Sequence, residues 1–117
     1  MKLERYKYEG LGFPIYLENV DAYKFDGDIH PIIDIRTVNC WAIRFLMMKN
    51  EMFIGSHIAF IRKYFSFTIK EFSKEIKLPE EIIEGWEFCG QYPTNMSTVM
   101  QMKIQNYIFD RLLKKGN

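Results

Sequence analysis

The chain has 117 residues, of which 48% are apolar and 16% aromatic, which is enough to build a core and excludes a disordered protein. The formal net charge is +1, so the whole molecule has no strong attraction for a polyanion. Two cysteines, Cys40 and Cys89, are too few for a disulfide framework and indicate reduced thiols. Residues 1–20 have no signal-peptide pattern, and the longest apolar run is too short to span a bilayer. We therefore expect a soluble, cytoplasmic protein with no membrane partner.

Residues 1–36 carry the alternating pattern of a small β-rich unit. Asp26-Gly27 separates two runs of alternating apolar residues. This pair favours a tight hairpin, because both turn positions require positive φ. The pattern predicts a return strand over residues 29–35. That strand should lie at a sheet edge or start late, because Pro31 cannot donate a ladder hydrogen bond.

Residues 37–54 are predicted to form a linking helix and a short connection. Between residues 38 and 49, apolar side chains recur at the three- and four-residue spacing of one helix face. The residues expected on the inner face are Val38, Trp41, Ala42, Phe45 and Met48.

Residues 55–117 are expected to form a helical domain. Its first helix should begin at Ser56, a good N-cap residue. The second should begin at Thr68, whose spacing from Glu71 is that of a capping box. The third should have Pro79 in its first turn and end at Gly90. The apolar positions expected to pack together in these helices are Ile58, Ile61, Phe72, Ile76, Leu78, Ile83 and Trp86.

A last helix is expected over about residues 97–115, with more apolar surface than the chain itself can cover. An inner stripe at four-residue spacing consists of Met100, Ile104, Ile108 and Leu112. The apolar side chains outside it are Val99, Tyr107, Phe109 and Leu113. This surplus predicts a homodimer. The elements together predict an α+β fold, with a small N-terminal β unit followed by a mainly helical domain.

The helical part resembles the Xre/Cro-type helix-turn-helix family from Phe65 onward. The residues that carry this resemblance are Thr68, Phe72, Ser73, Ile76, Leu78, Ile83, Trp86 and Glu87. Two upstream segments, FIGSHIAFIRKYF (residues 53–65) and YKYEGLGFPIYLENV (residues 6–20), are similar to antitoxin-type regulators related to MqsA/YgiT. The chain lacks the zinc-binding Cys-x-x-Cys pairs of those proteins and has Lys77 where the family prefers a turn glycine.

The resemblance implies a transcriptional regulator that binds double-stranded DNA as a dimer. The helix that follows Leu78 would enter the major groove, and basic side chains would contact the phosphates. The N-terminal β unit would serve dimerisation or bind a partner protein, such as a toxin. The residues that we expect at the DNA are Arg62, Lys63, Thr68, Lys70, Lys74, Lys77, Glu80, Glu81 and Glu84.

The three glutamates distinguish two hypotheses. Glu80, Glu81 and Glu84 stand where the family has side chains that meet bases. They could accept hydrogen bonds from cytosine amino groups, or they could stabilise the positive end of their own helix. The lysines could likewise contact phosphates or form an ordinary solvated face that nearby glutamates neutralise. The alternative function is a degenerate helix-turn-helix that binds a protein without specific DNA binding.

No residue pattern indicates catalysis or a metal. The residues that could be considered for zinc, His30, His57, Cys40 and Cys89, match no known ligand spacing. No nucleophile–base pair stands out either. We therefore expect a protein that is not an enzyme and uses no cofactor.

Overall fold

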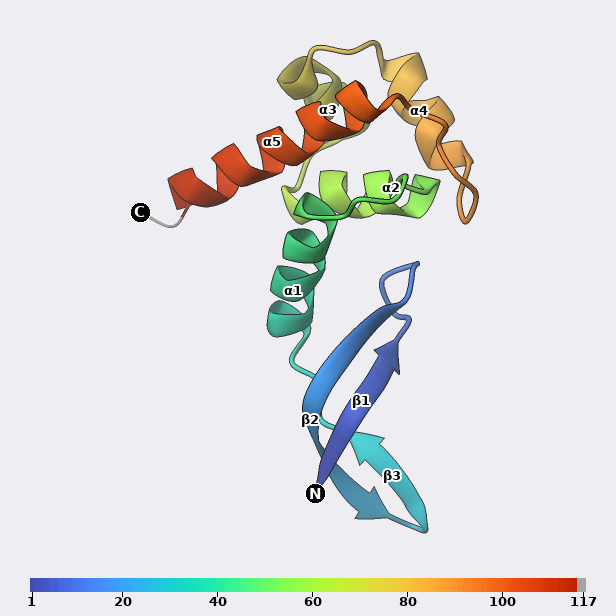
Figure 1. Cartoon of the computed structure of the whole chain (residues 1–117), viewed down its shortest axis with the longest axis vertical. Helices are drawn as coiled ribbons and strands as arrows, with labels where there is room; N and C mark the ends of the chain where they lie inside the picture. The colour runs from blue at the N-terminus through green and yellow to red at the C-terminus, as the bar shows by residue number, and fades with distance from the viewer. Residues whose placement is uncertain (116–117) are drawn as a thin grey trace. The chain divides into compact units, whose positions relative to one another are not determined.

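The computed structural model describes residues 1–115 of the chain, without the side chain of Lys115. The chain forms two compact units, residues 1–42 and 43–117, and their boundary falls inside helix α1 (Ile35–Met47). Within the described residues, a three-stranded antiparallel sheet precedes five helices (Figure 1). The α+β class expected from the sequence, with its N-terminal β unit, is confirmed.

The sheet consists of β1 (Lys2–Tyr8), β2 (Ile15–Phe25) and β3 (Asp28–Pro31), in the order β1-β2-β3. The predicted hairpin is confirmed between β2 and β3, where Phe25 pairs with Asp28. Asp26 and Gly27 both have positive φ, +54° and +84°, as a two-residue turn between right-twisted strands requires.

The predicted return strand over residues 29–35 is wrong in its second half. β3 ends at Pro31, at the edge of the sheet, and Ile35 already belongs to α1. Asp34 causes the change, because its carboxylate accepts the Arg36 N–H at 3.0 Å and the Thr37 hydroxyl at 3.2 Å. These bonds satisfy donors in the first turn of α1 and start a helix where alternation suggested a strand.

The predicted inner face of α1 is right for two of its five residues and wrong for the other three. Val38 and Ala42 are buried as expected, and Ile43 and Leu46 are buried with them. The exposed fractions of the other three expected side chains are 63% for Trp41, 45% for Phe45 and 74% for Met48. The helix carries apolar residues on most of its surface, so two different stripes satisfy the same helical spacing.

The second unit contains α2 (Gly55–Tyr64), α3 (Ile69–Ile76), α4 (Glu80–Phe88) and α5 (Thr98–Lys115). The residues expected to pack together form much of its core. Five of the seven are buried: Ile58, Ile61, Phe72, Ile76 and Ile83. Leu78 and Trp86 are half-buried. α5 adds Ile104 and Ile108, each fully buried.

Ser56 does not cap α2, contrary to the sequence-based prediction. The N-cap residue is Ile54, and its N–H donates to Nδ1 of His57 at 3.0 Å. Ser56 lies in the first turn, where its hydroxyl and its N–H both donate to the Gly90 carbonyl, at 3.2 and 2.9 Å. The start of α2 is therefore hydrogen-bonded to the segment that follows α4.

The close approach of these two segments requires a glycine at position 55. A Cβ there would collide with backbone atoms of Trp86 and Gly90, which cannot move aside as a flexible side chain would. An isolated bridge pairs Ile54 with Pro93, and the Gly55 N–H donates to the Tyr92 carbonyl at 3.2 Å. The two backbones thus approach too closely for any side chain at Gly55.

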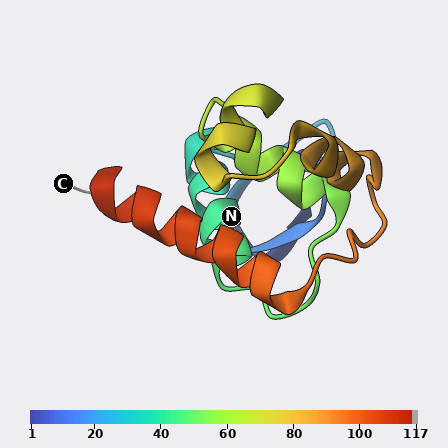
Figure 2. The same ribbon diagram turned by 90° about the horizontal axis from the view of Figure 1, so that it is seen from above.

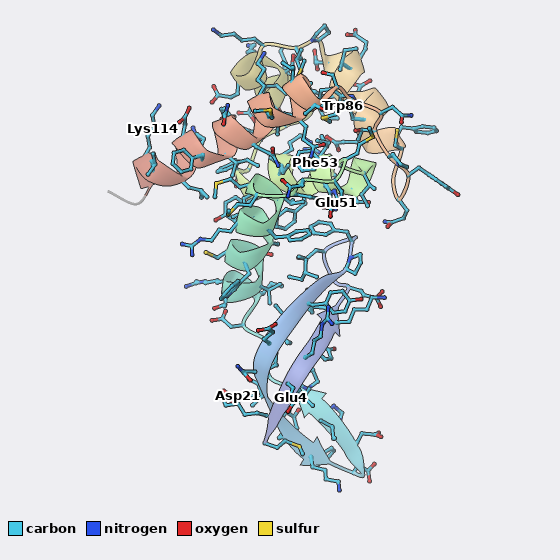
Figure 3. The ribbon with its side chains drawn as sticks, in the orientation of Figure 1. Glu4, Asp21, Glu51, Phe53, Trp86 and Lys114 are labelled. Carbon is cyan, nitrogen blue, oxygen red and sulfur yellow. The ribbon has the colours of Figure 1, made fainter. Side chains whose placement is uncertain are left out.

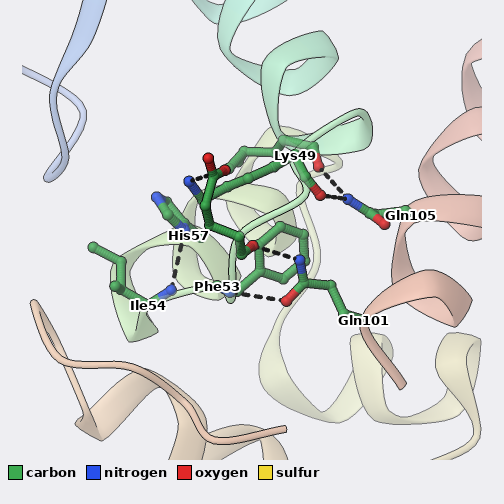
Figure 4. A network of polar contacts seen from close by, with 8 residues as sticks. Lys49, Phe53, Ile54, His57, Gln101 and Gln105 are labelled. Carbon is green, nitrogen blue, oxygen red and sulfur yellow. Dashed lines mark hydrogen bonds and ion pairs between the residues drawn. The ribbon is translucent and has the colours of Figure 1, made fainter. Parts of the chain in front are cut away.

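Two glutamines of α5 hold the connection between α1 and α2 (Figure 4). Gln101 is buried; its side chain accepts from the Phe53 N–H at 2.8 Å and donates to the Glu51 carbonyl at 2.7 Å. Gln105 donates to the carbonyls of Leu46 and Lys49, at 3.0 and 2.7 Å. Backbone groups at the end of α1 and in the following connection are thus paired inside the protein rather than with water.

Candidate nucleic-acid interface

The turn between α3 and α4 places Lys77 in a backbone conformation that favours glycine. Lys77 is left-handed, with φ +58° and ψ +47°. Its N–H and the N–H of Leu78 both donate to the Ser73 carbonyl, and the Ser73 hydroxyl donates to the Leu78 carbonyl. The hydrogen bonds of this turn hold Lys77 in a backbone conformation that disfavours side chains with a Cβ.

Thr68 forms the predicted capping box at the start of α3. Its hydroxyl accepts the Glu71 N–H at 3.1 Å, and Glu71 accepts the Thr68 N–H at 2.9 Å. This backbone hydrogen bond is the largest of the contributions that lower the pKa of Glu71. The carboxylate of Glu71 is therefore hydrogen-bonded to the backbone at the start of α3.

The other glutamate of α3, Glu75, faces α5. The Tyr107 hydroxyl donates to Glu75 at 2.7 Å, and the Arg111 guanidinium lies 3.7 Å from the same carboxylate oxygen. Burial, and then this hydrogen bond, raises the pKa of Tyr107. Tyr107 also packs edge-on against the ring of Phe72, so it is an inward side chain of α5 rather than part of its surplus apolar surface.

The lysines of α3 form an exposed stripe. Lys70 and Lys74 lie four residues apart on α3, and Lys77 follows directly after the helix at its left-handed C-cap; all three are exposed. In the part of the chain that the structure describes, no member of this lysine stripe (Lys70, Lys74 and Lys77) forms an ion pair, although the charge of Lys74 contributes to lowering the pKa of Glu71. Lys63 is also exposed, in the last turn of α2.

Arg62 differs from these lysines, because its guanidinium is bound within the protein. Nε and one terminal nitrogen donate to the two carboxylate oxygens of Glu87, at 2.8 and 2.9 Å. The other terminal nitrogen donates to the Phe67 carbonyl at 2.9 Å. The side chains of Arg62 and Glu87 are only 14% and 15% exposed, and the bidentate pair raises the pKa of Arg62. The pair joins α2 to α4, so Arg62 as placed is not available to a phosphate.

α4 offers an acidic surface where a reading helix would face DNA. Glu80, Glu81 and Glu84 are exposed, and the helix contains no lysine or arginine. The first two lie in its first turn, where a carboxylate interacts favourably with the positive end of the helix dipole. At the other end of α4, Phe88 is 93% exposed. All charged residues of α4 are therefore acidic, whereas α3 carries both lysines and glutamates.

The roles of Glu87 and of the two glutamines of α5 were not predicted from the sequence. The dipeptide at residues 86–87 contributed to the resemblance, but nothing nearby indicated that Glu87 bonds a residue 25 positions earlier. Gln101 and Gln105 interrupt the apolar pattern of α5, and polar residues beside an inner stripe are the one signal that could have indicated buried hydrogen bonds.

Two further observations concern other kinds of site. Among residues 1–115, no group of three His, Cys, Asp or Glu side chains is placed to hold a metal ion. In the same part of the chain, every helix is too short or too polar to cross a bilayer. No protein-family model, no curated protein and no solved structure matches the chain.

Proposed function

We propose that this protein is a helix-turn-helix regulator of the antitoxin kind. It would bind double-stranded DNA as a dimer, chiefly by contacting the phosphates of the DNA. In this proposal the lysine stripe of α3, together with Lys63, supplies the affinity. α4 lies close to the duplex but gives little base readout, because its exposed carboxylates repel the DNA.

One observation carries the proposal: among the described residues, the lysine stripe is exposed and forms no ion pair. Glu71 is held by the capping box and Glu75 by Tyr107 and Arg111. The expected affinity is modest, because Arg62 is bound to Glu87. Four lysine–phosphate contacts, each lowering the log–log salt slope by about 0.9, give a slope of roughly −3.6 for each bound unit.

The second candidate is a protein-binding module that has lost DNA binding. The exposed surface of α4 favours it, because carboxylates are combined there with a phenylalanine that is 93% exposed. An aromatic side chain beside acidic groups suits a partner protein with a basic, apolar surface, such as a toxin. Phe88 is the side chain that such a partner would bury.

Fluorescence anisotropy with a labelled duplex from the gene's own upstream region separates the candidates. In the triple variant Glu80→Gln, Glu81→Gln and Glu84→Gln, the carboxylates are removed while good helix formers remain. The proposal predicts tighter DNA binding by this variant than by the wild type, with little preference over a shuffled duplex. Binding by neither protein at low salt would leave the protein-binding module as the function. If the substitutions instead abolished selective binding of the upstream duplex, the carboxylates would be reading bases.

A further inference from the structure

An exposed apolar stripe runs along α5 with the spacing of a coiled-coil seam. Its members alternate at three- and four-residue steps, which correspond to the a and d positions of a heptad. They are Val99, Met102, Asn106, Phe109 and Leu113, here called the α5 seam. The exposed fractions of the four apolar members lie between 49% and 77%, and Asn106 is also exposed. The α5 seam therefore lies apart from the inner face of α5, which carries Ile104 and Ile108.

The seam continues onto a part of α5 that the other helices of this unit do not cover. Figure 1 and Figure 2, which are perpendicular views, both show the C-terminal end of α5 extending beyond α2, α3 and α4. Lys114 lies on this extension (Figure 3). Towards its N-terminal end, the seam borders an open groove of about 590 Å³ between α3 and α5, with Ile76 in its lining. An apolar seam of this length needs a partner to remove it from water.

The α5 seam is complementary to itself when the helix direction is reversed. Val99 and Leu113 lie seven residues on either side of Asn106, and Met102 and Phe109 lie at nearly matching distances. The flanking charges are opposite: Lys103 and Asp110 are both exposed, on the same side of the seam. The midpoints of these three pairs fall within one residue of Asn106. A two-fold axis at Asn106 would therefore set every side chain against a suitable partner.

We infer that the α5 seam binds a second copy of this chain, with the two α5 helices antiparallel about a two-fold axis at Asn106. Lys103 of each copy then lies beside Asp110 of the other, so the ion pair forms twice, as an isologous interface requires. The two Asn106 amides meet at the axis and fix the register, which is the known effect of a single polar residue in an apolar seam. This inference specifies the dimer that the proposed function assumes.

Charge reversal tests the arrangement in the full-length chain. Lys103→Glu places like charges against Asp110 of the partner, and Asp110→Lys does the same against Lys103. Because each contact occurs twice, either single variant should weaken dimerisation roughly tenfold. The double variant Lys103→Glu/Asp110→Lys restores opposite charges and should return the dissociation constant to near the wild-type value. Lys114→Glu, an exposed position on the same helix outside the seam, is the matched control and should have no effect.

Sedimentation equilibrium measures the dissociation constant, and circular dichroism verifies that each variant remains folded. A seam on one helix is smaller than the roughly 800 Å² per partner of a stable interface, so we expect a dissociation constant on the order of 10 µM. A wild-type chain that stays monomeric at about 200 µM, well above that constant, would overturn the inference. A dimer whose strength is unchanged by both single reversals would exclude the antiparallel arrangement. A dimer that the double variant fails to restore would also exclude it. DNA binding enters none of these measurements, so the dimer and the proposed function can fail separately.

Discussion

Replacing Arg62 with methionine should destabilise the protein, because its guanidinium holds α2 to α4. Removing one partner of a fully buried ion pair costs about 3–5 kcal/mol, whereas an exposed pair contributes about 0–1 kcal/mol. Arg62 and Glu87 are 14% and 15% exposed, between these limits but nearer to the buried one. The Phe67 carbonyl also loses its donor. We therefore expect the free energy of unfolding to fall by about 2–3 kcal/mol.

Urea denaturation followed by circular dichroism measures this loss. The matched control is Lys63→Met, the adjacent exposed residue, which should change the stability by less than about 0.5 kcal/mol. The double variant Arg62→Met/Glu87→Met should be more stable than the sum of the two single effects predicts, by about 1–2 kcal/mol, because neither charge is left alone. If Arg62→Met were as stable as the control and only weakened DNA binding, Arg62 would be a phosphate contact and the structural assignment would be wrong.

Three further substitutions test local features. Lys77→Gly should raise the free energy of unfolding by about 0.5–1 kcal/mol, because glycine adopts the left-handed conformation without strain. A urea titration that showed a less stable variant would mean that Lys77 is not strained. Gly55→Ala should lower the free energy of unfolding by about 1–3 kcal/mol, because the added Cβ would collide with backbone atoms of Trp86 and Gly90. A variant as stable as the wild type would show that the start of α2 can move away from the segment at the end of α4. Burial, and then the charge of Lys49, lowers the pKa of His57 to about 4 from 6.5. Between pH 6.5 and pH 4, His57 therefore takes up a proton in the unfolded chain but not in the folded chain. The free energy of unfolding of the wild type should be roughly 2 kcal/mol lower at pH 5 than at pH 7.5. His57→Gln, which keeps a hydrogen-bond acceptor, should remove most of this pH-dependent decrease in stability. A decrease of unchanged size in the variant would exclude His57 as its source.

The features that the sequence predicted correctly depend on neighbouring residues. The turn at Asp26-Gly27 and the capping box at Thr68 and Glu71 are complete within four residues, so propensity alone determines them. The short helices of the second unit were likewise marked by Pro79 at the start of one of them and by a repeating apolar pattern. One local signal was overlooked: Asp34 stands directly before an apolar helical pattern, which is typical of an N-cap.

The features that could not be predicted depend on contacts between distant residues. α1 is apolar on most of its surface, so only packing determines that Leu46 is buried and Trp41 is exposed. The candidate site shows the same limit. The sequence assigned Arg62 to the same basic group as the lysines, and only the position of Glu87, on another helix, distinguishes it. The lysine stripe and the three glutamates of α4 were found from the sequence, because charge and helical spacing are both visible there.

The salt dependence of DNA binding measures directly how much of the affinity the lysine stripe supplies. The wild type and the variant Lys70→Gln/Lys74→Gln/Lys77→Gln are titrated against a labelled duplex by fluorescence anisotropy, over a range of salt concentrations. Lys24→Gln, an exposed position of β2, is the matched control. We expect a log–log slope of roughly −3.6 per bound unit for the wild type and the control. The triple variant, which retains only Lys63 of the four lysines, should give a slope nearer to about −1. Equal slopes and equal affinities for all three proteins would contradict the proposal that the lysine stripe supplies the affinity.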